Sequence, residues 1–221
     1  MSYLRLTLLS DGPTDQALLP ILRWLIAQRS TRPFERNWAD LKRLRKPPTK
    51  LRDRVEKALE LYPCDLLVIH RDAEREPPEN RLEEIEGATR GRGIPVVAAV
   101  PVRMTEAWLL FDEAAVRRAA GYPNGSMPLA LPSLKRAEAT PDPKEDLHKA
   151  LTTASGLSGR RIKQFQPDIR RLADLIDDFA PLRALPSFQA FEASLCTGLL
   201  SLGVLQERGS VAGSGAAKDQ G

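Results

Sequence analysis

The chain has 221 residues, 42% of them hydrophobic and 28% charged, with a formal net charge of +4. This composition is ordinary for a globular protein, and the length suits one large domain or a domain with an appendage. The cysteines, Cys64 and Cys196, form no CxxC pair, which excludes a cysteine-rich zinc module. The sequence contains no run of about 18 apolar residues, so no membrane span is expected. With no predicted signal sequence, we expect a cytoplasmic protein without membrane contact.

The predicted elements of the first half alternate between strand and helix. An apolar run over residues 3–9, which ends at a Ser-Asp-Gly turn, predicts the first strand. Apolar positions at helical spacing predict a helix over 15–28, and a basic loop is expected over 30–50. A second helix, over 51–61, leads into a strand over 66–69.

A loop with two adjacent prolines and a largely charged helix over 81–90 come next. The apolar run over 94–100 is typical of a strand buried on both faces, and a helical pattern follows from 109 to about 120. This alternation predicts an α/β domain with a parallel sheet over residues 1–120.

The second half is expected to be helical. Residues 121–208 combine a proline-rich connection with a helical C-terminal part packed on the first domain, with helices over 147–154, 168–179 and 187–205. Residues 209–221 are rich in Gly, Ala and Ser and predict a disordered tail.

Acidic residues follow each predicted strand. Asp11 comes after the first strand, Asp72 and Glu74 after the second, and Glu106 after the third, while Asp15 starts the helix after strand one. Because parallel strands bind ligands outside their carboxyl ends, we expect these side chains to lie together. Crowded carboxylates resist ionisation unless a cation compensates them. Mg²⁺ or Mn²⁺ with oxygen ligands would do so and would suit phosphodiester chemistry. Taken singly, an Asp-x-Glu pair is more often a solvated turn, and Asp11 alone could cap a helix.

Two other enzyme classes are excluded. His70-Arg71-Asp72 spells the catalytic motif of protein kinases, but the required asparagine is replaced by Pro77, and the other kinase motifs are absent. The chain has no Walker A motif, so it is not itself a P-loop ATPase.

Three motifs in order resemble the TOPRIM fold, and more closely the TOPRIM-related DUF4276 family. They are DGPTD at 11–15, DAE at 72–74 and EAWLLFD at 106–112, where the family shows EGxTE, DxD and EAWLLxD. The likeness covers roughly residues 3–200 and implies a TOPRIM-like, Rossmann-like parallel sheet flanked by helices, with a helical C-terminal extension.

The resemblance implies a divalent-metal-dependent nuclease. Asp11 would be the general acid or base, and Asp72 and Glu74 would bind Mg²⁺. Asp15 and Glu106 resemble extra metal ligands of the overcoming-lysogenization-defect nucleases. Such proteins commonly work beside an ABC-type or SMC-like ATPase in antiphage defence, which implies a partner ATPase. Asp replaces Glu at positions 11 and 15 and Glu replaces Asp at 74, so a noncatalytic site stays an alternative.

Basic residues near these motifs are candidates for contacts with nucleic acid. Arg71 flanks the acids and could contact a scissile phosphate or neutralise them. The candidate contacts to the phosphate backbone are Lys42, Arg43, Arg45, Lys46, Arg103, Arg160, Arg161 and Lys163. Few aromatic residues lie among them, so base stacking on single strands is not predicted.

Three functions remain open from the sequence. The leading prediction is a metal-dependent nuclease acting on DNA or RNA, the effector of an antiphage system. The alternative is a noncatalytic TOPRIM-like regulatory or binding subunit of an ATPase complex. A phosphoacceptor domain of receiver type is third, because that fold also gathers acids around Mg²⁺, although no lysine follows the third predicted strand. Homo-oligomer formation is left open.

Overall fold

A parallel sheet of four strands forms the centre of the computed structural model, which describes residues 3–206. The strands are β1 (Leu4–Leu9), β2 (Phe34–Trp38), β3 (Leu66–His70) and β4 (Val96–Ala99), in the order β2-β1-β3-β4. The register pairs Leu9 with Ile69 and His70 with Ala99. Three neighbouring strands therefore end at nearly the same level, and the predicted α/β class with a parallel sheet is confirmed.

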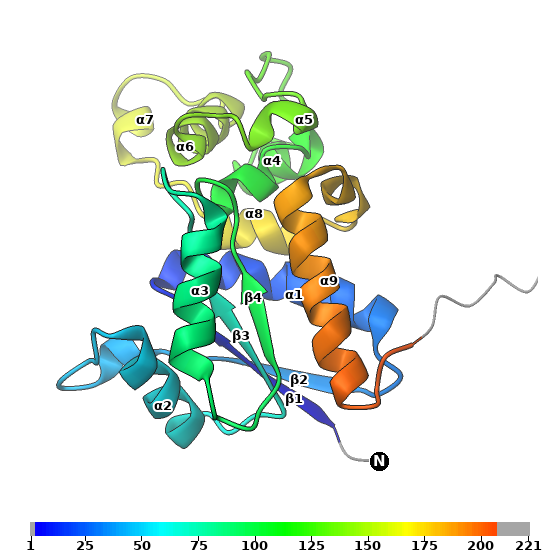
Figure 1. Ribbon diagram of the computed structural model, residues 1–221. Helices are drawn as coiled ribbons and strands as arrows, with labels where there is room; N and C mark the ends of the chain where they lie inside the picture. The colour runs from blue at the N-terminus through cyan, green and yellow to red at the C-terminus, as the bar shows by residue number, and fades with distance from the viewer. Residues whose placement is uncertain (1–2, 207–221) are drawn as a thin grey trace, which may run out of the picture.

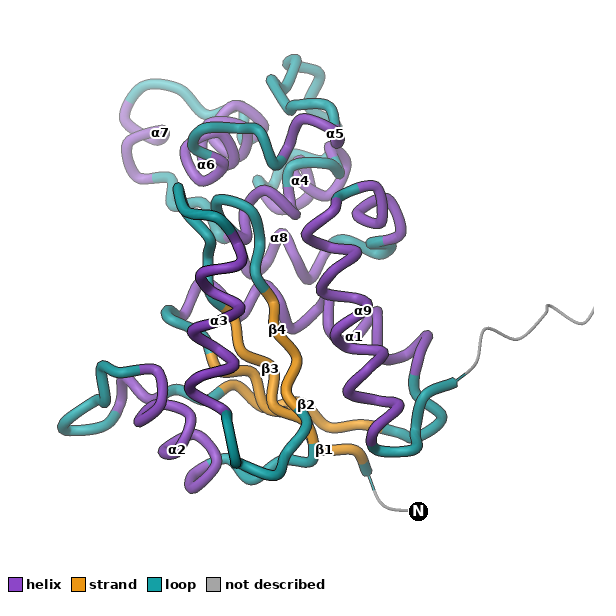
Figure 2. Tube along the Cα trace, viewed as in Figure 1, coloured by secondary structure: helices purple, strands orange, loops and turns teal. Residues whose placement is uncertain are grey.

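Helices cover both faces of the sheet (Figure 1). The helices are α1 (Leu18–Arg29), α2 (Leu51–Leu61), α3 (Pro78–Thr89), α4 (Glu113–Ala119), α5 (Leu134–Ala137), α6 (Pro143–Ala154), α7 (Arg160–Gln164), α8 (Ile169–Leu175) and α9 (Pro186–Ser201). One face packs against α2 and α3, and the other against α1 and α9. Figure 2 shows the same layers, with the helical C-terminal region above the sheet.

The strands are apolar because both of their faces are buried. All five residues of β3 are buried, and their side chains alternate between two cores. Leu66 and Val68 face the α1 and α9 side, whereas Leu67 and Ile69 face α2 and α3. A continuous apolar run with little alternation is what such a doubly covered strand requires.

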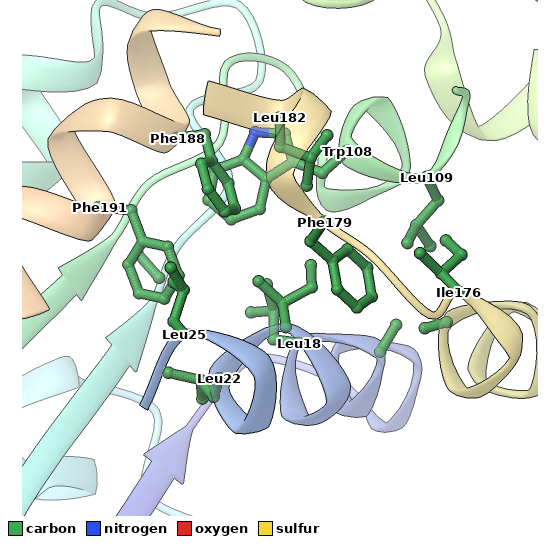
Figure 3. Packing of buried hydrophobic residues seen from close by; sticks show 14 of the residues in the cluster. Leu18, Leu22, Leu25, Trp108, Leu109, Ile176, Phe179, Leu182, Phe188 and Phe191 are labelled. Atoms are coloured by element: carbon green, nitrogen blue, oxygen red, sulfur yellow. The ribbon is translucent and has the colours of Figure 1, made fainter. Parts of the chain in front are cut away.

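The larger core extends from the sheet into the helical C-terminal region (Figure 3). Trp108 is fully buried, and its ring lies 5.3 Å from that of Phe188 and 5.5 Å from that of Phe191. Its indole N–H donates a hydrogen bond to Ser187 Oγ at 3.0 Å. Trp108 is therefore a core residue, and it fixes α9 to the motif that contains Glu106.

The structure corrects several predicted boundaries. Residues 34–38, expected in a loop, form β2, and the expected helix over 15–28 begins as a 3₁₀ helix, Pro13–Ala17, before α1. The helix expected from residue 109 is preceded by a 3₁₀ helix, Thr105–Leu109, and α4 starts only at Glu113. The disorder predicted for 209–221 lies outside the described residues. Within residues 3–206, no helix is both long and apolar enough to span a membrane.

Candidate functional site

The predicted acids follow strands at the point in the sheet where the chain reverses the direction in which it adds strands. The chain passes from β1 to β2 on one side and then crosses to β3 on the other, so β1 and β3 are neighbours. In open α/β sheets, the crevice beyond the carboxyl ends of two such strands is the usual ligand site. Asp11 follows β1 and Asp72 follows β3, which places both at this carboxyl end of the sheet.

A buried histidine lies between two of these acids. His70 is 1% exposed; its Nε2 is 3.0 Å from Asp72 Oδ1, and its Nδ1 is 3.5 Å from Asp15 Oδ2. The longer contact lacks hydrogen-bond geometry and is an ion pair only. Burial alone would lower the pKa of His70, but the two carboxylates outweigh burial and raise the pKa to about 9. At neutral pH an imidazolium therefore joins Asp15 to Asp72.

Thr105 completes the environment of His70. Its Oγ1 lies 2.8 Å from His70 Nε2, and its backbone N–H donates to Asp72 Oδ1 at 3.0 Å. The carboxylate of Asp72 is thus held by a side chain of β3 and by the backbone of the segment after β4. Because Thr105 is only 4% exposed, its hydroxyl is placed to hold His70 rather than to meet a substrate.

Asp15 is tied into its own turn. The backbone N–H of Gly12 donates to Asp15 Oδ2 at 2.7 Å. Burial would raise the pKa of Asp15, but its contact with His70 and this backbone hydrogen bond outweigh burial and lower the pKa. Asp15 therefore carries a negative charge that the chain already compensates.

Asp11 makes ion pairs with two arginines. Arg54 Nη1 contacts Asp11 Oδ1, and Arg71 Nε lies 3.3 Å from Asp11 Oδ2. Arg54 also donates to the backbone carbonyl of Ser10 at 2.6 Å, and Arg71 pairs with Glu84 at 3.0 Å. Within residues 3–206, no hydrogen bond joins Asp11 to Asp15, Asp72 or Glu106. Arg71 thus neutralises an acid, one of the two roles expected for it.

Glu106 lies within the electrostatic reach of Asp15 and Asp72. Its side chain is largely enclosed, with 7% of the residue exposed. Burial raises the pKa of Glu106 and the negative charges of Asp72 and Asp15 raise it further, against a smaller lowering by its own backbone N–H and by Lys144. Three of the five predicted acids, at positions 15, 72 and 106, therefore influence one another.

The backbone is strained where the loops after β3 and β4 meet. Glu74 and Arg103 have φ angles of 57° and 67°, and no other non-glycine residue in the described part has a positive φ. The N–H of Glu74 donates to the carbonyl of Arg103 at 2.9 Å. Such conformations cost about 1–3 kcal/mol each and concentrate at functional sites. Glu74 is exposed in this turn, whereas Asp72 is half-buried and held by His70 and Thr105.

The acids as arranged do not fit a divalent cation. Carboxylate oxygens have the right donor chemistry for Mg²⁺ or Mn²⁺. Among the described residues, however, no three His, Cys, Asp or Glu side chains are grouped so that they could hold a metal ion. Two arginines engage Asp11, Glu74 lies in an exposed turn, and His70 stands between Asp15 and Asp72.

The predicted basic residues lie on two sides of the carboxyl end of the sheet. Lys42, Arg43, Arg45 and Lys46 belong to the segment after β2, where a hollow of about 260 Å³ is lined by Asp11, Lys42 and Arg54. Arg43 pairs with Asp40 at 2.5 Å. Arg160, Arg161 and Lys163 are exposed on α7. Arg103 occupies the strained turn beside Glu74.

Sequence reasoning missed two kinds of residue. His70, Thr105 and Arg54 bind the acids, but no motif singled them out. Lys144, His148 and Arg170 line a hollow of about 520 Å³ together with Pro13 and Thr14. The only sequence signal for His70 is its position two residues before Asp72, at the end of an apolar run.

Searches against protein families, curated proteins and solved structures found no match to the chain. The resemblance to TOPRIM proteins therefore rests on the three motifs and on the parallel sheet, which is compatible with a TOPRIM or Rossmann-like fold.

Proposed function

We propose that the chain is a noncatalytic, TOPRIM-like binding subunit that holds the phosphate backbone of a nucleic acid at the carboxyl end of its sheet. The compensation of the acids by the chain's own cations supports this proposal most directly. Arg54 and Arg71 neutralise Asp11, and His70 joins Asp15 to Asp72. Acids that are already paired do not need a metal ion to be stable at this position.

The free cations nearby support nucleic acid as the ligand. Among the described residues, Lys42, Arg45 and Lys46 make no ion pair, and the same is true of Arg160, Arg161 and Lys163 on α7. Lysine and arginine side chains that stay unpaired contribute to affinity by neutralising phosphates and releasing counterions. Because backbone contacts carry no sequence information, the proposed binding is nonspecific for sequence and strongly dependent on salt.

The proposal is tested by fluorescence polarisation with labelled single- and double-stranded oligonucleotides over a range of salt concentrations. The variant Lys42→Glu/Lys46→Glu should weaken binding about tenfold or more and make its salt dependence less steep. A matched control, Lys57→Glu/Arg90→Glu, changes the charge equally on α2 and at the end of α3. Equal losses in both variants, or no binding by the unaltered chain, would contradict the proposal.

The predicted metal-dependent nuclease is the second candidate. The strained turn at Glu74 and Arg103 and the raised pKa of buried Glu106 favour it, because both features are typical of catalytic sites. Cleavage of DNA or RNA that needs Mg²⁺ or Mn²⁺ and is lost on Glu106→Gln substitution would establish this candidate over the first. The ATPase partner and the antiphage role come from the resemblance alone and stay predictions.

A further inference from the structure

The free edge of the sheet lies at the bottom of an apolar groove. β4 is the last strand, with α3 on one side of it and α9 on the other (Figure 1). Between the two helices is a groove of about 430 Å³, which we call the β4 groove. Its lining includes Leu82, Ala98, Val100, Ala190, Phe191 and Ser194. This site is separate from the acids at the carboxyl end of the sheet.

Within residues 3–206, the backbone edge of β4 that faces this groove pairs with no other strand. The carbonyls of Ala99 and Pro101 accept hydrogen bonds from the backbone N–H groups of Arg71 and Ala73, which follow β3. The backbone of residues 99 and 101 therefore faces the interior of the sheet. The backbone of Ala98 faces the groove instead, where its N–H donates to Ser194 Oγ at 3.1 Å. Free edges are normally protected by charges or by a covering segment. β4 has the sequence VVAA and carries no charge.

The outer face of α9 is uncharged along its whole length. The only charged residue of this helix, Glu192, is buried and paired with Arg29 and Arg183. The exposed positions of α9 are Pro186, Gln189, Ala190, Ala193, Thr197, Leu200 and Ser201. This face combines small apolar side chains with the uncharged polar side chains of Gln189 and Thr197. The uncharged face of α9 and the free edge of β4 form one continuous surface that lacks a covering element in residues 3–206.

The opposite rim of the groove is acidic. Glu79 lines the groove together with Leu82, which is 42% exposed. Glu83 is exposed one turn further along α3. Neither carboxylate makes an ion pair or hydrogen bond within the described residues. Arg81, the cation nearest in sequence, is engaged by Glu84 and by the carbonyl of Asp72. An occupant of the groove therefore meets an apolar floor and a negative rim.

We propose that the β4 groove binds an extended segment of a partner protein, in which small apolar residues alternate with lysine or arginine. The segment adds as a strand beside β4, so its main chain pairs with the outward-facing backbone of residues 96, 98 and 100. Its apolar side chains lie over Val100 and Phe191, and its cations face Glu79 and Glu83. The hydroxyl of Ser194 occupies the place of a strand carbonyl and turns aside when the segment binds.

The charges favour a basic segment over a second copy of this chain. A twofold axis perpendicular to the sheet would pair the two β4 edges and keep both α3 helices on the same face. Glu79 and Glu83 would then face their own counterparts across the interface, and like charges at close range oppose association. A basic segment meets the same carboxylates favourably.

The test uses the full chain and two labelled peptides, one alternating lysine with valine and the other glutamate with valine. Fluorescence polarisation should detect binding of the lysine peptide alone. Glu79→Lys/Glu83→Lys should weaken this binding about tenfold or more, whereas the matched control Glu35→Lys/Glu145→Lys should change it by less than about twofold. Ser194→Ala should strengthen it, because the N–H of Ala98 is freed. Ala190→Arg, an exposed substitution, should block the groove and abolish binding.

Four results would overturn the proposal. They are equal binding of the two peptides, equal effects of the two double variants, no effect of Ala190→Arg, and no binding by any form of the chain. Sedimentation that shows a dimer dissociated by Ala190→Arg would instead identify a second copy as the occupant. Peptide binding that appears only after residues 207–221 are removed would identify the C-terminal segment as the occupant.

Discussion

The charge on buried His70 should make the stability of the fold depend on pH in a defined direction. The pKa of this imidazole is raised from 6.5 to about 9 in the folded chain. A group with a raised pKa contributes its full stabilisation below the unfolded value and loses it as the pH rises through the folded value. Each pH unit is worth about 1.4 kcal/mol, so the free energy of unfolding should fall by about 3 kcal/mol between pH 6.5 and pH 9.

The assay is urea unfolding followed by tryptophan fluorescence at several pH values, for the unaltered chain and for His70→Gln. The variant should be less stable at pH 6.5, and the difference between the two chains should shrink as the pH approaches 9. Asp15→Asn removes one of the two carboxylates and should therefore reduce, in part, the fall in the free energy of unfolding between pH 6.5 and pH 9. Parallel stability curves for the unaltered chain and His70→Gln would refute the assignment of an imidazolium between Asp15 and Asp72.

Three further predictions concern packing and buried charge, and all are checked by urea unfolding. Trp108→Ala should cost about 3–5 kcal/mol, because it empties a fully buried site, whereas Trp108→Phe should cost clearly less. Gly198→Val should destabilise by about 2 kcal/mol, since a Cβ there lies 2.8 Å from Leu66, but Gly87→Ala, in open space on α3, should stabilise by about 0.5–1 kcal/mol. Glu192→Gln should cost about 3 kcal/mol because Arg29 then lacks its buried partner; a change below about 1 kcal/mol would contradict this.

The sequence predicts a helix or strand well where one face of that element, or all of it, is buried. Leu51–Leu61 shows apolar residues at helical spacing, and β3 is an unbroken apolar run, so both could be located closely. β2 was missed because it is an outer strand with alternately exposed residues, including Glu35 and Asn37. Without an apolar run, its pairing with β1 depends on contacts that the local sequence does not reveal.

The location of the candidate site followed from topology, but its internal pairing did not. Parallel strands must bring Asp11 and Asp72 to the same end of the sheet, and an α/β pattern is enough to predict that. One of the two arginines that pair with Asp11, Arg54, comes from α2, more than forty positions further along the chain. An ion pair between residues so far apart in the sequence depends on how the chain crosses from strand to strand and on where the side chains point. The sequence therefore predicts the acids but not the cations that pair with them.

The central claim is that the chain's own cations neutralise Asp11, Asp15 and Asp72 at the carboxyl end of the sheet. Calorimetric titration of Mg²⁺ and Mn²⁺ into the purified chain tests it most directly, with Asp72→Ala/Glu74→Ala as the comparison. The account predicts no heat of binding that depends on Asp72. Binding to the unaltered chain that disappears in the double variant would contradict it and establish this end of the sheet as a metal site.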